Sequence, residues 1–175
     1  YWDGGLVSNT PLEWIIEYGR EHDHEQDILA FQVDLWSSRG QLPRNIADVV
    51  TRVKEIQYSS RTRASTDQFK RVQRIRRAID ALLHEVPEDL RRNDEVQILK
   101  TVASRKVYNI VQLIYRAQNY EGHSKDYEFS RLSMRDHWGA GYHDAVRTLR
   151  HPEVLARPTG LDGVLTFDLE RDGRE

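Results

Sequence analysis

The sequence predicts an α/β fold in which a small sheet is accompanied by long, charged helices. Two mostly apolar runs of strand length, residues 28–36 and 107–115, lie among segments whose apolar residues recur every three or four positions. Parallel strands that are buried on both faces have this continuous apolar character. The chain of 175 residues is 38% hydrophobic and 31% charged, which suits one core surrounded by solvated helices.

The first predicted helix runs from Thr10 to about Glu21. Thr10 is a good N-cap, Pro11 fits the first helical position, and Glu13 stands where a capping box requires it. The apolar run at residues 28–36 follows and predicts a buried parallel strand. A helix followed by such a strand is one step of an α/β sheet.

The loop at residues 37–44, which contains serine, glycine and proline, is the predicted boundary between two regions. Residues 1–43 would form the end of a first domain. Residues 44–175 would form a helix-rich extension, because beyond the loop the apolar residues repeat at three and four positions. The pattern of residues assigns no role to this extension.

The extension is predicted to begin with two helices. The first would be capped by Asn45 and extend to about Ile56, and the second would run from about Ser65 to His84. Residues 59–63, which are serine, threonine and arginine, lead from one to the other. We therefore expect a non-helical break between the two helices.

The second of these helices is the most basic part of the chain. Lys70, Arg74 and Arg77 fall on one helical face. Such a face fits lipid headgroups or phosphates, and it equally fits a solvated helix face. Nucleic acid is not an expected partner, because aromatic residues are not interleaved with these cations and the net charge is −2.

The remaining elements alternate between helix and strand. A helix is predicted over residues 88–104, and a second buried strand over residues 107–115, where the apolar spacing also fits a helix. Ser133 is predicted to cap a further helix that ends before Pro152. The short apolar stretch at residues 163–169 would add an edge strand.

The chemistry predicted for this chain rests on its first twelve residues. Asp3 precedes Gly4 and Gly5, which adopt positive φ without a Cβ clash, so that its carboxylate can be held in a sharp turn. A helix start follows within a few residues. An ordinary turn explains the same three residues, since aspartate and glycine are common turn formers.

Asp3-Gly4-Gly5, followed by Asn9-Thr10-Pro11-Leu12, resembles the Asp-Gly-Gly/Ala motif of patatin-like phospholipases. The resemblance implies the end of a three-layer α/β/α sandwich, followed by a mainly helical extension with one or two further strands. It makes residues 1–43 the C-terminal end of a catalytic domain. In that family the aspartate is the base of a Ser–Asp dyad that cleaves lipid acyl esters, which implies this role for Asp3. Aspartate can act without histidine when burial raises its pKa.

Three further stretches resemble the uncharacterised domain that follows the patatin module in many bacterial patatin-like proteins. These are residues 57–63, residues 120–130, and the set His137-Trp138, Gly141-Tyr142 and Asp144-Ala145. Together the two resemblances span nearly the whole chain. The second one implies a family and no chemistry.

The nucleophile of patatin-like enzymes sits in a Gly-x-Ser-x-Gly elbow, close to a glycine-rich oxyanion hole. No serine of this chain has glycine on both sides at that spacing. We therefore expect the chain to be the C-terminal portion of a longer bacterial enzyme, to need an upstream segment for its serine, and to be inactive alone. The expected substrate is a lipid carboxyl ester. The rival expectation is a non-catalytic module that binds a partner protein or a membrane surface.

No metal or cofactor is expected. The pairs His22/His24 and His137/His143 lack the helical ligand spacing of three or four residues, and no third ligand is placed by the sequence. A triad built from Ser130 or Ser133 with His137 and Asp144 would have no nucleophile elbow.

The composition also bears on the compartment. The absence of cysteine excludes disulfides and thiolate metal sites, and it suits a reducing compartment. No apolar run approaches the roughly 20 residues that span a bilayer, and the chain does not start with a signal peptide. We expect a cytoplasmic protein, with peripheral contact to a membrane left open.

Overall fold

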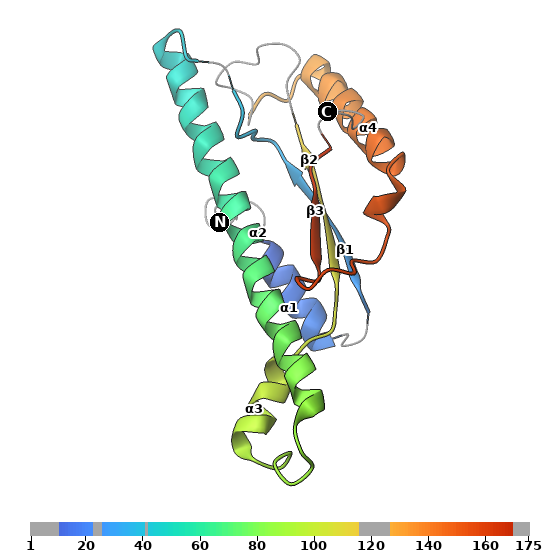
Figure 1. Cartoon of the computed structure of the whole chain (residues 1–175). Helices are drawn as coiled ribbons and strands as arrows, with labels where there is room; N and C mark the ends of the chain where they lie inside the picture. Colours follow the sequence, from blue (N-terminus) through green and yellow to red (C-terminus); the bar gives the residue numbers. More distant parts are fainter. Residues whose placement is uncertain (1–10, 23–25, 41, 116–126, 170–175) are drawn as a thin grey trace.

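A parallel three-stranded sheet organises the fold (Figure 1). The computed structural model describes residues 11–22, 26–40, 42–115 and 127–169. The strands stand in the order β1-β2-β3. They are β1 (Ile28–Asp34), β2 (Tyr108–Ile114) and β3 (Val164–Phe167). The predicted α/β class and the positions of all three predicted strands are therefore confirmed. The predicted burial of β1 is wrong on one face, where Leu29, Phe31 and Val33 are exposed because no described element covers them.

The register runs without a break along both strand pairs. Ile28 of β1 stands opposite Tyr108 of β2, and Tyr108 stands opposite Val164 of β3. Helices occupy most of the remaining described chain. They are α1 (Leu12–His22), α2 (Ile46–Glu85), α3 (Asp94–Val102) and α4 (Arg131–Leu149), with a short 3-10 turn η2 (Pro152–Val154).

The core lies between the sheet and the helices α1 and α2. Leu12 and Ile16 of α1 and Phe69 of α2 form a buried cluster with alternate residues of the sheet. Phe69 meets Tyr108 edge to face, with ring centroids 4.9 Å apart. The alternation of strand side chains leaves Asn109 on the opposite face of the sheet. There its amide donates to the carbonyl of Val154, at 2.6 Å, which places η2 on that second face.

The direction of α1 follows from contacts at its last turns. The Lys106 ammonium, just before β2, lies 3.4 Å from the Gly19 carbonyl. A Cβ on Gly19 would stand 3.5 Å from Ile28, the first residue of β1. The C-terminal turns of α1 therefore lie beside the start of the strands. Leu12, where α1 begins, lies toward the carboxyl ends of the strands.

Helix α2 is one continuous helix of 40 residues, about 60 Å long at 1.5 Å per residue. The predicted interruption at residues 59–63 is wrong. The Ser59 hydroxyl donates to the Glu55 carbonyl one turn earlier, so this serine is accommodated inside the helix. No glycine or proline occurs between Ile46 and Glu85 to stop it.

Two predicted helix starts are also wrong. After Pro87 the chain forms tight turns, in which Leu90 and Arg91 donate to carbonyls only three residues back, so α3 starts at Asp94. Helix α4 is capped by Ser130 instead of Ser133, because the Ser130 hydroxyl accepts a hydrogen bond from the Ser133 backbone. Both errors concern where a helix begins rather than whether it exists.

The predicted domain boundary at residue 43 stays a prediction. Strand β1 precedes this position and β2 follows it, yet the two strands are paired along the whole of β1. Backbone hydrogen bonds of one sheet therefore join the two predicted regions.

Candidate functional site

The carboxyl end of the parallel sheet is the candidate site. Open α/β sheets bind ligands at this end of their strands. Here it carries two buried polar side chains of β1, Gln32 and Asp34. An Asp34 carboxylate oxygen accepts a hydrogen bond of 2.9 Å from the Trp36 backbone, and the Asp34 carbonyl accepts one of 2.7 Å from the backbone of Tyr115. Asp34 thus fixes the turn that ends β1.

Gln32 differs from its neighbour. It is only 7% exposed, and both polar atoms of its amide are buried without a hydrogen-bond partner. It lies on the same face of β1 as Ala30, which packs against the core beneath α1 and α2. A buried amide without hydrogen bonds costs about 1–3 kcal/mol. Such a group is uncommon in a folded protein and is suited to receive both a donor and an acceptor.

Aromatic rings surround this end of the sheet. Trp36 stacks on Tyr58 of α2, with centroids 5.6 Å apart and an interplanar angle of 19°. The Lys54 ammonium lies 5.9 Å from the Trp36 ring centroid and 5.8 Å from that of Tyr127. These contacts hold the N-terminal half of α2 beyond the end of β1.

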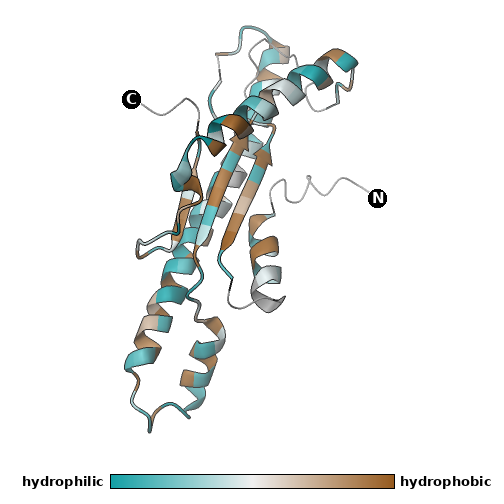
Figure 2. Cartoon of the chain, turned by 90° about the vertical axis from the view of Figure 1, so that its right-hand side faces the viewer, coloured by the Kyte–Doolittle hydropathy of each residue, from teal (hydrophilic) through white to brown (hydrophobic). Residues whose placement is uncertain are grey.

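A second aromatic contact joins the sheet to α4. The rings of Tyr115, just after β2, and His137 of α4 meet edge to face at 4.6 Å. Figure 2 shows α4 crossing the sheet near the tips of the strands, while the sheet face below it stays open to view. The first turns of α4 therefore belong to the carboxyl end of the sheet.

The predicted catalytic residue, Asp3, and its glycines Gly4 and Gly5 lie outside the described residues. The first described helix, α1, begins at Leu12, which lies toward this end of the sheet. Sequence reasoning did not single out Gln32. Its position inside an apolar strand was the available sign, because a polar side chain there must be either exposed or hydrogen-bonded.

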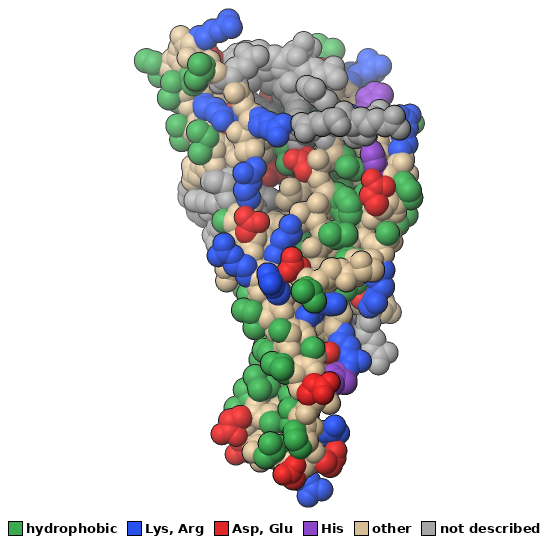
Figure 3. All heavy atoms as spheres, viewed as in Figure 1, with side chains coloured by type: hydrophobic (Ala, Val, Ile, Leu, Met, Phe, Trp, Pro, Cys, Tyr) green, Lys and Arg blue, Asp and Glu red, His purple; other side chains and the backbone are tan. Residues whose placement is uncertain are grey.

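The three predicted surface cations make contacts within the molecule. The Lys70 ammonium donates to the Thr166 hydroxyl of β3 at 2.7 Å, and Arg77 donates to the Arg105 carbonyl at 3.0 Å. Arg74 lies 3.6 Å from a carboxylate oxygen of Asp162 in an exposed pair. Figure 3 shows basic side chains gathered along α2. The prediction that these three side chains contact an anionic surface stays a prediction. Their hydrogen bonds and ion pair within the molecule indicate that they hold β3 and the start of β2 against α2.

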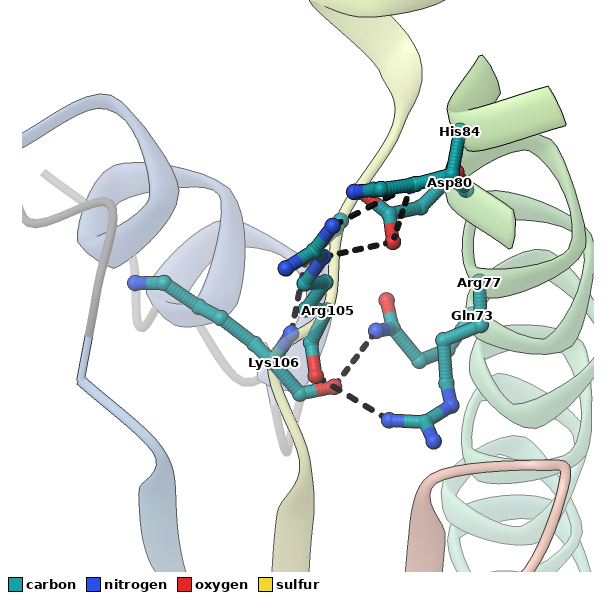
Figure 4. Close-up of polar contacts among 7 residues, drawn as sticks. Gln73, Arg77, Asp80, His84, Arg105 and Lys106 are labelled. Carbon is teal, nitrogen blue, oxygen red and sulfur yellow. Dashed lines mark hydrogen bonds and ion pairs between the residues drawn. The ribbon is translucent and has the colours of Figure 1, made fainter. Parts of the chain in front are cut away.

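Polar contacts at the start of β2 complete this attachment (Figure 4). Gln73, which is fully buried, donates from its amide to the Lys106 carbonyl at 2.8 Å. The Arg105 guanidinium donates to the Asp80 carboxylate at 2.7 Å. The labelled side chains lie between α2 and the chain just before β2, at the opposite end of the sheet from Gln32. We therefore assign these side chains a structural role, which is to attach α2 to the chain just before β2.

A titratable pair also lies at this amino end. The Arg157 guanidinium donates to the Asp27 carboxylate at 2.7 Å, and the Val107 backbone donates to its other oxygen at 3.0 Å. The hydrogen bond from Arg157 lowers the pKa of Asp27 below its ordinary value of 3.8, against a smaller opposing effect of burial. This pair ties the start of β1 to the segment between η2 and β3.

The residues of the rejected triad have other partners. Ser130 caps α4, and the Asp144 carboxylate pairs with Arg147 at 2.8 Å. Over the described ranges, no group of three or more histidine, cysteine, aspartate or glutamate side chains is arranged to hold a metal ion. None of the helices in those ranges combines the length and apolar character needed to cross a membrane.

A family model described as "Patatin phospholipase" matches residues 56–160, more than half of the chain. The chain belongs to the patatin phospholipase family. Searches of curated proteins and of solved structures returned no match. The match confirms the family predicted from the two resemblances, and it covers β2, α3, α4 and most of α2.

The matched range covers only part of the candidate site. Tyr58, Tyr115 and His137, which surround the carboxyl end, lie inside the matched range. Asp3 and Gln32 precede it. The patatin phospholipase match therefore supports a lipid hydrolase family for this chain and leaves the catalytic residues to be argued from chemistry.

Proposed function

We propose that this chain is the C-terminal portion of a serine acyl hydrolase that cleaves lipid carboxyl esters. Asp3 is the base of a Ser–Asp dyad, and an upstream segment supplies the serine. The patatin phospholipase match supports the lipid substrate class. The base takes the proton of the serine hydroxyl as the oxygen attacks the ester carbonyl, and it gives this proton to the alcohol that leaves when the ester bond breaks. Water, deprotonated by the same base, then hydrolyses the acyl-enzyme to release the fatty acid and the free serine.

The observation that carries this proposal is the direction of α1. Because α1 begins toward the carboxyl end of the sheet, we expect the Asp-Gly-Gly motif that precedes it to lie at the end where α/β enzymes keep their catalytic groups. The buried polar end of β1 lies at the same end. A carboxylate there would be partly desolvated, which raises its pKa toward the range of a useful base.

The free edge of β1 supports an upstream segment. In the described part of the chain, only β2 pairs with β1, so its other edge offers backbone groups to a further strand. Leu29, Phe31 and Val33, on the face away from the core, are exposed. A right-handed crossover through α1 would place a strand that precedes Tyr1 parallel to β1 and next to it.

This arrangement also gives the proposed domain organisation a physical meaning. Residues 1–43 would close the catalytic sheet, and residues 44–175 would add β2 and β3 beside β1 and cover them with helices. The extension would then stabilise the catalytic end of β1 through Trp36 and Tyr58.

The test is ester hydrolysis by a longer protein that includes the upstream segment. Asp3→Asn keeps the shape of the side chain but removes the base, and we expect a loss of kcat of at least about 100-fold on a short-chain ester. Asp162→Asn is the matched control, because this exposed carboxylate pairs only weakly with Arg74. Undiminished hydrolysis by Asp3→Asn would remove Asp3 from the mechanism.

A second assay tests the placement of the nucleophile. The 175-residue chain alone should not hydrolyse the ester. Hydrolysis by this chain that disappears with Ser130→Ala or Ser133→Ala would show that the nucleophile lies within residues 1–175, and the upstream serine would be rejected.

A further inference from the structure

Helix α4 presents its apolar stripe to solvent. Met134, Trp138, Tyr142 and Leu149 recur at spacings of four, four and seven, which places them on one side of a helix. Each of these side chains is at least 52% exposed. Thr148, the only buried residue of α4, lies off this side of the helix. A surface helix of a globular protein ordinarily has the reverse arrangement.

The same side of α4 carries positive charge. Arg131 and Arg135 precede Trp138 by seven and three residues, and both are exposed. Neither guanidinium makes an ion pair with another described residue. The carboxylates of the helix are elsewhere, since Asp136 falls off this side and Asp144 pairs with Arg147. The stripe is therefore apolar and aromatic with arginines beside it.

This combination matches the surface of an anionic bilayer. Tryptophan and tyrosine have an apolar body and a polar tip, and they are enriched where membranes meet water. Amphipathic helices that lie in this interface carry such residues on one side and attract anionic headgroups with Lys or Arg. Arginine is also enriched at protein interfaces, and it is the shared positive charge of Arg131 and Arg135 that favours an anionic surface. The exposed row on β1, Leu29, Phe31 and Val33, has no flanking arginines and suits a further layer of protein.

The position of α4 connects the stripe to the candidate site. His137 contacts Tyr115 at the end of β2, so the first turns of α4 are held at the carboxyl end of the sheet. Trp138, which follows His137, is turned outward there. A bilayer bound by the stripe would lie beside the end of the sheet where a lipid ester is to be cleaved.

We propose that α4 is an interfacial helix that docks this chain on an anionic lipid bilayer, with Trp138 and Tyr142 inserted and Arg131 and Arg135 at the headgroups. The proposal rests on the proposed lipid substrate. It differs from the earlier expectation for Lys70, Arg74 and Arg77, whose charged groups contact β3, Asp162 and the Arg105 carbonyl. The docking surface is on the other side of the sheet.

The test is co-sedimentation of the 175-residue chain with vesicles of ether-linked phosphatidylcholine. The vesicles are prepared with and without about 30% ether-linked phosphatidylglycerol, which supplies the negative charge. We expect binding to the anionic vesicles that weakens as salt is raised. Trp138→Gln with Tyr142→Gln should lower the partition coefficient about tenfold or more, since each anchor loses its apolar burial. Arg131→Gln with Arg135→Gln should remove the preference for anionic vesicles.

Trp14→Gln is the matched control, because Trp14 of α1 is 80% exposed and Trp138 is 76% exposed. It should leave binding within about twofold of wild type, a small change beside the tenfold expected for the anchors. Circular dichroism melts of all variants check that the fold is kept. Equal binding by wild type and the Trp138/Tyr142 variant overturns the proposal, and so does an absence of binding by the wild-type chain.

Two further outcomes separate this proposal from its neighbours. If the wild-type chain is a dimer in light scattering and the Trp138/Tyr142 variant is a monomer, the stripe is a protein interface and the lipid proposal fails. Ether-linked lipids contain no acyl ester, so binding is measured without hydrolysis. Vesicle binding by α4 together with an active Asp3→Asn enzyme would reject the proposed mechanism and support the interfacial helix.

Discussion

Two buried glutamines, Gln32 of β1 and Gln73 of α2, offer a matched measurement of what an unbonded amide costs in this fold. Gln32 is 7% exposed and Gln73 is 0% exposed. The Gln73 amide nitrogen donates to the Lys106 carbonyl at 2.8 Å, whereas neither polar atom of the Gln32 amide has a partner. Methionine has nearly the same length and shape as glutamine and no amide to satisfy.

The expected effects have opposite signs. Gln32→Met removes a desolvation cost of about 1–3 kcal/mol and breaks no hydrogen bond, so it should raise the free energy of unfolding by about 1 kcal/mol or more. Gln73→Met breaks the bond to Lys106 and leaves that carbonyl without its amide donor. The Gln73 amide oxygen also lacks a partner, which offsets part of the loss, so we expect destabilisation of about 1 kcal/mol.

Chemical denaturation of wild type and both variants measures these changes, with melting temperature as a second readout. In a chain of this size, 1 kcal/mol corresponds to a shift of about 2–4 °C. Equal m-values would show that the unfolded state is unchanged. If Gln32→Met destabilises the protein as much as Gln73→Met does, the argument from the unbonded amide is refuted. Gln32 would then have a bonding partner in solution.

Three shorter predictions concern other parts of the sheet. Gly163→Ala should lower the free energy of unfolding by about 1–3 kcal/mol, because φ is +65° there and a Cβ would collide with the Arg77 side chain; denaturant titration measures it. The hydrogen bond from Arg157 lowers the pKa of Asp27 in the folded protein. The stability that this bond contributes is therefore present above the ordinary carboxyl pKa of 3.8 and is lost as the pH falls through the lowered pKa. Asp27→Asn should therefore reduce the acid sensitivity of the melting temperature. The backbone amides of β1 should exchange their hydrogens more slowly in a longer protein that includes the upstream segment than in the 175-residue chain. The exchange rates of the α4 amides should be the same in both proteins.

The strands were predictable because the sequence pattern that indicates a strand lies within the strand itself. Residues 28–34 and 108–114 form apolar runs with β-branched and aromatic members, and such runs are recognisable in the sequence alone. The continuity of α2 was not, because a Ser-rich stretch is typical of both a loop and a solvated helix. The decisive contact is the bond from Ser59 to the Glu55 carbonyl, which exists only once the helix has formed.

The candidate site was predictable only in part for a similar reason. The motif around Asp3 is contiguous, so a resemblance could identify it. The unbonded state of Gln32 depends on the side chains that α1 and α2 place around it, and no sequence pattern specifies them. The apolar spacing of Trp138 and Tyr142 predicts a helix but does not say which side faces the sheet. The contact between His137 and Tyr115 settles that orientation.

The exposed apolar row on β1 and the exposed apolar stripe on α4 differ in the partners that their chemistry admits. The row of Leu29, Phe31 and Val33 lies on a strand with a free edge, so its natural partner supplies backbone hydrogen bonds as well as apolar contact. The stripe on α4 lies on a helix whose backbone groups are already bonded, so its partner needs to supply only an apolar layer and negative charge. A protein strand meets the first requirement and an anionic bilayer meets the second. If both partners bind, the carboxyl end of the sheet is fixed between the upstream segment and the lipid, which is the position that hydrolysis of a membrane ester requires.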